Sequence, residues 1–545
     1  MLRQDRPRPR TRAAIAAGLA TIVLTAAACS GSSGSSGSAG GGGATTSTSR
    51  GSTAVALRAL HAVRGADARI VDDHGDEVLL RGVNVNSLGD YFQANPAYKT
   101  TIPVTDADWS AMSAAGFDVV RLLISWSRLE PTRGHIDQAY LDEIHAAVAA
   151  AARHGIWSVI DMHQDAWGKY VASPPGKACP ADSEPGIGWD GAPEWATITD
   201  GADTCAAAGV RELAPAVMHA FDHFYADTDG IQTELVEAWA AVATSFAGDP
   251  AVAGYDLLNE PNWGTDQDSA GAKLGAFYQR AVTAIRGAEK AAGGFSHIVF
   301  FEPVVLFPTP SSLPPAATVS DPNMVFAPHN YHGSIDGGTP EQGFADDAAA
   351  AARYGTTFWI GEYGWFGDGA KDAPEVARFA QAQDKYQVGG AWWQWKQACG
   401  DPHSVGERNG TPTDQIVEFN INGCPGDKDL GPVPEWFPIL SRGYPREAPG
   451  RLTSLRSDGP AGSVSLSGDS SEAGTDARLV VWVPDRGHGL PHIGGQGVSH
   501  LAHTTVDGGW LITAQACKGG YTLTVGPNAP ELSSSCATSQ LNDNT

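Results

Sequence analysis

Two glutamates, each placed directly behind a short apolar run, could together cleave a glycosidic bond. Glu260 follows residues 254–258 in "YDLLNEPNWG", and Glu362 follows residues 357–361 in "FWIGEYGW". Glycosidic cleavage needs one carboxyl group to protonate the leaving oxygen and a second to attack the anomeric carbon. A single glutamate in a loop is more often a solvated surface residue. The pair therefore carries chemistry only if the fold brings both side chains to one cavity.

Eight short β-rich runs, separated by alanine-rich helical stretches such as 140–153 and 274–291, indicate such a fold between residues 68 and 445. They predict an α/β protein, a (β/α)8 TIM barrel, because continuous apolar strands suit a parallel sheet covered on both faces. Residues at the carboxyl ends of barrel strands line the active-site mouth, so Glu260 and Glu362, behind the fourth and seventh strands, should meet there. The predicted strands are 80–86, 119–125, 157–162, 254–258, 297–301, 324–329, 357–361 and 390–395.

Polar side chains also stand at the ends of the third and sixth predicted strands. Asp161, His163 and Asp165 alternate in "DMHQDAW", so strand geometry places them on one face. His329 and Tyr331 share a face in "APHNYHG" in the same way. A lone histidine is usually a satisfied core residue. Here both histidines stand at the rim that carries the two glutamates, which favours a role in the site.

Two more strands place an arginine and a pair of tryptophans. Arg121 lies among apolar residues in "VVRLLISW", and a buried arginine requires an anionic partner, for which we expect Glu362. Trp393 and Trp395 alternate in "GGAWWQWKQ". A tryptophan at the barrel mouth offers a flat apolar platform for a sugar ring. We expect Trp395, nearer the end of the strand, to be that platform and Trp393 to fill the core.

Together these residues resemble glycoside hydrolase family five, and within it the endoglycoceramidase group. The resemblance covers the whole barrel. The narrower likeness draws on "DMHQD", on "RLLISWSRLEPTRG", on the "YPR" at 444–446 and on the predicted C-terminal β-domain. The residues that carry the family resemblance are Arg121, His163, Asn259, Glu260, Pro261, His329, Tyr331, Glu362 and Trp395.

The resemblance implies a retaining mechanism in which Glu260 is the acid/base and Glu362 the nucleophile. The carboxyl groups should then lie about 5 Å apart. Asn259 would donate to the sugar 2-hydroxyl, while Arg121 and Tyr331 would favour the ionised form of the nucleophile. The acid/base needs surroundings that keep it protonated at first. The two aspartates and the histidine behind the third strand would hold the reducing-end glucose.

We expect the chain to cleave the β-glycosidic bond between an oligosaccharide and the ceramide of a glycosphingolipid. Trp263, Phe307, Trp365 and Phe366 follow strand ends and could line an apolar groove for ceramide, although packing under loops would explain them equally well. A family-five β-glucanase or mannanase, and a β-glucosidase acting on glucosyl lipids, are close alternatives. A non-catalytic, lipid-anchored carbohydrate-binding protein is the alternative from another class. The chemistry requires no metal or organic cofactor, and we expect a monomer.

The net charge and the N-terminal sequence indicate the partners and the cellular location of the protein. A formal net charge of -25 argues against nucleic acid as a partner. Five arginines precede the apolar run 13–28, which is followed by Cys29 and a Ser/Gly tract, so residues 1–29 read as an export or lipoprotein signal. We favour lipid attachment at Cys29 over plain secretion. The protein would then be extracytoplasmic, secreted or held at the outer face of a bacterial membrane, which it would contact through the anchor and its substrate.

Six further cysteines agree with export, because they fall into three local couples and none has zinc-site spacing. Nearest-neighbour pairing would staple three separate loops, although the sequence leaves the connectivity open. The couples are Cys179 with Cys205, Cys399 with Cys424, and Cys517 with Cys536.

The chain divides by composition into four parts. A Gly/Ser-rich linker is predicted over 30–53, the barrel over 54–445, and a C-terminal antiparallel β-sandwich over 446–538, where "ARLVVWVP" and "YTLTV" alternate between turns. A long insertion at 166–232 separates the third and fourth strands. Such an insertion either shapes the site or is a surface loop held by a disulfide, and the sequence favours neither interpretation.

Overall fold

The computed structural model describes residues 56–305, 307–404, 415–473, 477–527 and 529–530. The predicted signal segment, Cys29, the Gly/Ser linker and Cys536 lie outside these residues. Among the residues described, no helix is both long and apolar enough to cross a membrane.

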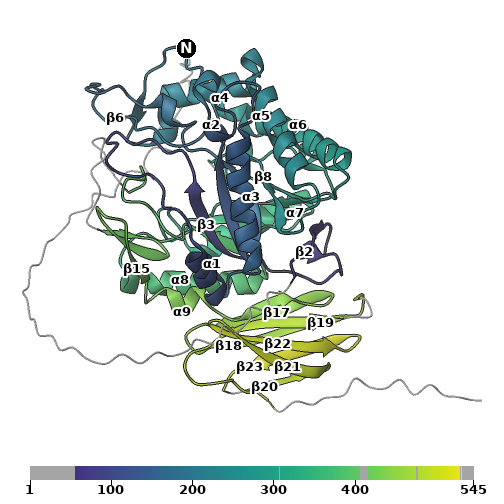
Figure 1. Cartoon of the computed structure of the whole chain (residues 1–545). Helices are drawn as coiled ribbons and strands as arrows, with labels where there is room; N and C mark the ends of the chain where they lie inside the picture. The colour runs from purple at the N-terminus through teal and green to yellow at the C-terminus, as the bar shows by residue number, and fades with distance from the viewer. Residues whose placement is uncertain (1–55, 306, 405–414, 474–476, 528, 531–545) are drawn as a thin grey trace, which may run out of the picture. The chain divides into compact units, whose positions relative to one another are not determined.

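Eight parallel strands form the sheet that the sequence predicts, in the order β10-β9-β8-β5-β4-β3-β12-β11 (Figure 1). Parallel bridges from Phe326 to Phe358 and from His329 to Glu362 join the two ends of this order, so the sheet closes into a barrel. The prediction of a TIM barrel is therefore confirmed. The strands are β3 (Arg81–Leu88), β4 (Val119–Ser125), β5 (Trp157–His163), β8 (Val252–Asp256), β9 (Ile298–Phe301), β10 (Met324–Phe326), β11 (Ile360–Tyr363) and β12 (Gly390–Trp392).

The helices cover the barrel because each has one apolar stripe. In α3, the residues Leu141, Ile144, Val148 and Ala151 recur at helical spacing and are all buried, and the carboxylate of Asp137 caps the first turn. Each residue of β4 and of β5 is buried, as expected for strands covered on both faces. The helices are α1 (Asp106–Ala114), α2 (Trp126–Leu129), α3 (Gln138–Arg153), α4 (Pro215–Tyr225), α5 (Ile231–Phe246), α6 (Ala270–Ala291), α7 (Pro340–Tyr354), α8 (Gly369–Tyr386) and α9 (Phe437–Leu440).

Two disulfides staple the excursions from the barrel. Cys179 pairs with Cys205 in the insertion, beside the short antiparallel pair β6 (Ser183–Pro185) and β7 (Cys205–Ala207). Cys399 pairs with Cys424 beside a three-stranded sheet. Both are nearest-neighbour pairings, a connectivity that the sequence left open, and the third couple falls partly outside the described residues. Strands that the sequence reading missed are β1 (Leu60–Val63), β2 (Arg69–Asp72), β13 (Gln415–Val417), β14 (Asn420–Gly423) and β15 (Lys428–Pro432).

The described residues between 444 and 525 form two antiparallel sheets (Figure 1), ordered β16-β19-β22-β21 and β17-β18-β23-β20. Their inward-facing residues share one apolar core, which includes Val481 and Ile512 from the first sheet and Leu466 and Leu523 from the second. This is the predicted β-sandwich. Its strands are β16 (Tyr444–Glu447), β17 (Arg451–Asp458), β18 (Ser463–Asp469), β19 (Arg478–Pro484), β20 (Ile493–Gln496), β21 (Val498–Val506), β22 (Gly509–Ala516) and β23 (Gly520–Val525).

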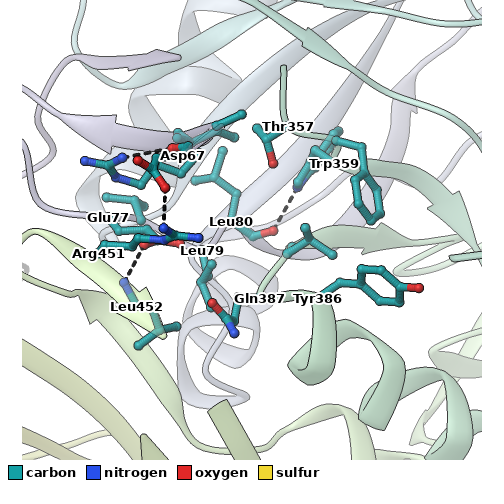
Figure 2. A pocket seen from close by; sticks show the side chains of 17 residues that line it. Asp67, Glu77, Leu79, Leu80, Thr357, Trp359, Tyr386, Gln387, Arg451 and Leu452 are labelled. Carbon is teal, nitrogen blue, oxygen red and sulfur yellow. Dashed lines mark hydrogen bonds and ion pairs between the residues drawn. The ribbon is translucent and has the colours of Figure 1, made fainter. Parts of the chain in front are cut away.

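A cavity of about 130 Å³ lies where the amino-terminal ends of the barrel strands meet β17 (Figure 2). Glu77 stands in its wall and accepts a hydrogen bond from the backbone N–H of Leu452 at 2.7 Å, and Arg451 pairs there with Asp67. Burial raises the pKa of Glu77 to about 7, outweighing that hydrogen bond and the nearby arginines. Because the amino-terminal face of such barrels serves stability, we assign this cavity to the framework.

Candidate active site

Arg121 is the centre of the charged groups inside the barrel mouth. Its guanidinium is fully buried and forms ion pairs with four carboxylates, from Asp161 (2.9 Å), Asp256 (2.8 Å), Glu302 (2.9 Å) and Glu362 (2.8 Å). The expected contact with Glu362 is present, but the expectation of a single partner is wrong. A closed barrel aims the side chains of several strands at one point, so the arginine is shared.

Four carboxylates around one guanidinium leave negative charge in excess. Burial raises the pKa of Asp256 and of Glu302, and in both cases it outweighs the opposing attraction of Arg121. His329 supplies further positive charge. Burial works to lower the pKa of its ring, but the surrounding glutamates raise it well above the ordinary value. This direction favours the imidazolium form of the ring.

Glu260 and Glu362 meet across His329. The ring atom Nδ1 lies 2.9 Å from Oε1 of Glu260 and 3.4 Å from Oε2 of Glu362. One carboxylate oxygen from each glutamate lies within 4.8 Å of the other. Tyr331 donates its hydroxyl to Oε2 of Glu362 at 2.9 Å. This separation fits the roughly 5 Å of retaining glycosidases and is too short for the gap of about 6.5–9.5 Å that an inverting enzyme needs for its water.

The backbone around Glu260 is held in an unusual conformation. Its φ is 39°, in the left-handed region that non-glycine residues rarely adopt. Glu302 accepts a hydrogen bond from the N–H of Glu260 at 2.8 Å, and the side-chain amide of Gln164 donates to the carbonyls of Asn259 (2.6 Å) and Glu260 (3.0 Å). Arg121 in turn donates to the side-chain oxygen of Asn259 at 2.9 Å. These contacts fix the direction in which Glu260 leaves the backbone.

The surroundings of Glu260 differ from the expectation that they keep it protonated. Burial works to raise its pKa, but the hydrogen bond and charge of His329 and the charge of Arg211 outweigh burial, so the pKa lies below its ordinary value. Nη2 of Arg211 lies 3.3 Å from Oε2 of Glu260. With these contacts in place the carboxyl group favours its ionised form.

The predicted wall behind β5 is present as a hydrogen-bonded triplet. His163 contacts Asp161 through Nδ1 at 2.8 Å and Asp165 through Nε2 at 3.3 Å. Burial works to lower the pKa of His163, but the two aspartates raise it to about 10. Trp393 stacks on the imidazole, with ring centroids 5.5 Å apart and an interplanar angle of 18°.

The family model for cellulase (glycosyl hydrolase family 5) matches residues 71–399 of this chain. The chain belongs to glycosyl hydrolase family 5. The match begins within β2 and ends after β12, so it includes all eight barrel strands, both glutamates and the Arg121 cluster.

The chain is also similar to proteins named endoglycoceramidase and endogalactoceramidase. It is 32% identical to endoglycoceramidase I of Rhodococcus hoagii over 277 residues, covering 48% of this chain and 51% of that protein, so it spans about half the length of this curated relative. A crystal structure of an endogalactoceramidase is 45% identical, with a TM-score of 0.79, over 86% of this chain and 100% of that one. Endo-glycoceramidase II from Rhodococcus sp., solved as a lactosyl-enzyme intermediate, is 25% identical with a TM-score of 0.65 over 85% and 100%.

Trp395 was expected to be the sugar platform of this family-5 site, but the structure places Trp393 there. Trp395 is buried, donates to Asp108 at 3.1 Å and stacks on Phe419 at 5.1 Å. Trp393 instead faces His163. The expectation assumed that strand alternation continues to residue 395, but β12 ends at Trp392. Trp393 therefore replaces Trp395 among the candidate site residues.

The insertion at 166–232 reaches the site through one turn. Arg211, in the 3-10 turn Arg211–Leu213, forms an ion pair with Asp165 at 2.7 Å besides its contact with Glu260. Its guanidinium lies 4.4 Å from the ring centroid of Trp189, which also belongs to the insertion. The insertion thus contributes to the site.

The residues proposed for a ceramide groove are mostly packed. Trp263 and Trp365 are buried, and Phe307 is half-buried with its ring 5.8 Å from that of Phe326. Phe366 is 38% exposed, and its ring lies 6.0 Å from that of Tyr331. Of the four, Phe366 alone is exposed, and it lies beside Tyr331, which donates to Glu362.

Sequence reasoning missed Asp256, Glu302 and Arg211. Glu302 directly follows β9 in "FFEP", so the signal that identified Glu260 could have found it. Asp256 is the last residue of β8, so it is also a carboxylate at a strand end, although it lies within the strand rather than behind it. Arg211 lies in a long loop between strands, where no local pattern indicates a place in the site.

Proposed function

We propose that the chain is a retaining glycoside hydrolase that cleaves the bond between a glycan and the ceramide of a glycosphingolipid. The observation that carries the catalytic part is the placement of carboxylate oxygens of Glu260 and Glu362 within 4.8 Å of each other across one imidazole. The ceramide part rests on the likeness to an endogalactoceramidase, at 45% identity over the whole of that chain.

In the first step an oxygen of Glu362 attacks the anomeric carbon, and the bond from that carbon to the ceramide oxygen breaks. Glu260 gives its proton to the departing oxygen, which leaves as the ceramide hydroxyl. In the second step Glu260 takes a proton from water, the water oxygen attacks the anomeric carbon, and Glu362 leaves. The lactosyl-enzyme intermediate of endo-glycoceramidase II supports the covalent first step.

The surrounding residues position these two groups. Arg121 and Tyr331 each bind one oxygen of Glu362 and orient the carboxylate for attack. One side-chain N–H of Asn259 donates to the carbonyl of Gln164, which leaves the second for the sugar 2-hydroxyl.

The aspartates of the wall differ in what they can offer a sugar. Asp161 is fully buried and bonded to Arg121 and His163, so it orients the imidazole. Asp165 stands at the other side of that imidazole, against Arg211, and is the carboxylate we assign to sugar hydroxyls. Trp393 supplies the platform beneath the ring.

The names of the relatives differ in the sugar that they specify, because one name contains galactose and the other only a glycan. The endogalactoceramidase is 45% identical, and endoglycoceramidase I of Rhodococcus hoagii is 32% identical. The higher identity favours galactose as the ceramide-linked sugar, and glucose is the second candidate.

The experiment is a release assay with galactosyl-linked and glucosyl-linked glycosphingolipids in detergent micelles, with β-glucan and mannan as polysaccharide rivals. We expect an intact oligosaccharide and free ceramide from one of the lipid series, and no release by Glu362→Gln. Polysaccharide cleavage without lipid cleavage would overturn the ceramide assignment. Tight binding with no turnover of any substrate would favour a carbohydrate-binding protein and remove the catalytic proposal.

We also propose that the protein is exported and lipid-anchored through Cys29. The arginine-rich start, the apolar run and the Ser/Gly tract after the cysteine support this, and the two disulfides suit an oxidising compartment. Labelling cells with an alkyne fatty acid should mark the wild-type protein and not Cys29→Ser. Equal labelling of both proteins would place the lipid elsewhere, and labelling of neither would favour plain secretion.

A further inference from the structure

Cationic side chains contact both oxygens of the acid/base. His329 contacts Oε1 of Glu260 at 2.9 Å, and Arg211 contacts Oε2 at 3.3 Å. A protonated carboxyl group accepts hydrogen bonds more weakly than a carboxylate, and it must turn its O–H toward the glycosidic oxygen. Two cations that face Glu260 therefore disfavour its acid form, and proton delivery to a glycosidic oxygen is favoured when one of the two contacts is given up.

Arg211 is the contact that can be given up. His329 is 8% exposed and is held at the same time by Glu302 and Glu362, so it cannot turn away without breaking the centre of the site. Arg211 is 23% exposed and lies on the insertion. Its charge stays compensated without Glu260, because Asp165 lies 2.7 Å and Glu212 2.5 Å from its guanidinium.

We propose that Arg211 is a positioning residue for the acid/base. It holds Glu260 until the glycosidic oxygen arrives, and then leaves it for Asp165 and the bound sugar. The inference rests on the proposed function, because it assigns Arg211 a part in the double displacement. The guanidinium contacts both Asp165, which we assign to the sugar hydroxyls, and Glu260, which donates the proton. Occupancy of the sugar position is thereby linked to the ionisation of Glu260.

The proton balance closes over one turnover. Glu260 gives its proton to the ceramide oxygen in the first step, and Arg211 can then return and stabilise the ionised form. In the second step Glu260 takes a proton from the attacking water, which ends the contact with Arg211 again. The proton for the first turnover comes from solvent, which the carboxyl group can reach because its side chain is 18% exposed.

Other charged groups around Glu260 stay in place while Arg211 moves. They belong to elements other than the insertion, and among them Asp165 loses its ion pair when Arg211 is substituted. The groups that face Glu260 or act on it by charge are His329, Glu302, Glu362, Asp165, Tyr331 and Asp336. The contact of Arg211 is therefore the one contribution to the ionisation of Glu260 that the insertion supplies directly.

The test is the pH dependence of kcat/KM for wild type, Arg211→Gln and Arg211→Lys. The substrate is the glycosphingolipid that the wild type cleaves. The basic limb of such a profile reports the loss of the proton from the acid. Arg211 lowers the pKa of Glu260, so its removal should move the basic limb to higher pH by about 1 unit, the lower end of the effect of a close opposite charge. The lysine variant keeps the charge and should keep the limb near the wild-type position.

Lys177→Gln is the matched control, because it removes a cation of the same insertion that pairs with Asp203 at the surface. Its profile should overlie that of wild type. A basic limb that stays in place in Arg211→Gln, while the protein remains folded and active, would overturn the inference and leave the proposed function intact. A wild type inactive on every glycoside would instead refute the proposed function. A limb displaced equally in the lysine and glutamine variants would show that shape rather than charge matters, which also contradicts the inference.

Discussion

Replacement of Glu77 by glutamine should change how the stability of the protein depends on pH. Glu77 is 5% exposed at the junction between the barrel and β17, where its carboxylate accepts from the N–H of Leu452. Glutamine has nearly the same shape, and its amide oxygen can accept the same hydrogen bond. The substitution therefore removes the titration of the side chain and keeps its packing.

The size of the effect follows from the pKa in the two states. The folded protein raises the pKa of Glu77 from 4.5 to about 7. Between these values the folded state binds more protons than the unfolded chain, so wild-type stability falls as pH rises through this window. A shift of about 2.5 units at roughly 1.4 kcal/mol per unit corresponds to about 3 kcal/mol. Relative to wild type, Glu77→Gln should therefore gain about 3 kcal/mol between about pH 4.5 and about pH 7.

Urea unfolding followed by tryptophan fluorescence at several pH values in this window measures the difference. Glu143→Gln is the control, because Glu143 is an exposed helix residue paired with Arg128 at the surface. Its difference from wild type should hardly change with pH. Parallel stability curves for wild type and Glu77→Gln would refute the reasoning, because they would mean that Glu77 is ionised at no cost in the folded protein.

Three further substitutions test the site and its supports. Arg121→Met should lower the free energy of unfolding by about 3–5 kcal/mol near neutral pH, because it leaves four buried carboxylates without their shared cation. Trp393→Ala should raise KM about tenfold through the loss of stacking worth about 1.4 kcal/mol, whereas Trp395→Ala should mainly lower stability, by about 3–5 kcal/mol. Joint replacement of Cys179 and Cys205 by serine should lower stability by about 2–4 kcal/mol and weaken catalysis through the displaced insertion. Urea unfolding and steady-state kinetics measure these effects.

Each of these outcomes has a counterpart that would contradict it. Arg133→Met is the control for Arg121, because Arg133 is an exposed arginine with a single carboxylate partner, Glu234, and its loss should barely affect stability. Equal destabilisation by both arginine substitutions would argue against the shared buried cation. A rise in KM for Trp395→Ala with none for Trp393→Ala would restore the original choice of platform. Unchanged kinetics in the double serine variant would show that the disulfide does not support the site.

Much of the barrel could be predicted because its signals are local. Each strand is a short apolar run, and residues such as Glu260 and Glu362 stand immediately behind one, so chain order and fold geometry together place them. The same reasoning failed at Trp395, since alternation holds only while a strand lasts and β12 ends at Trp392. Arg211 carried no signal, because a residue in a long loop is placed by contacts distant in sequence.

The sequence also limits what can be inferred about ionisation. The identity of the acid/base follows from its position, but its charge state depends on every group that closure of the barrel brings near it. Glu260 is separated in sequence from Arg211 by 49 residues and from His329 by 69, yet these two cations outweigh its burial. The surroundings were expected to keep this carboxyl group protonated at first, and the lowered pKa of Glu260 differs from that expectation for this reason. A glycosidase that holds its acid ionised until substrate arrives gains a carboxylate suited to the second step, so the contact with Arg211 can favour the general base there and yield to the general acid in the first step.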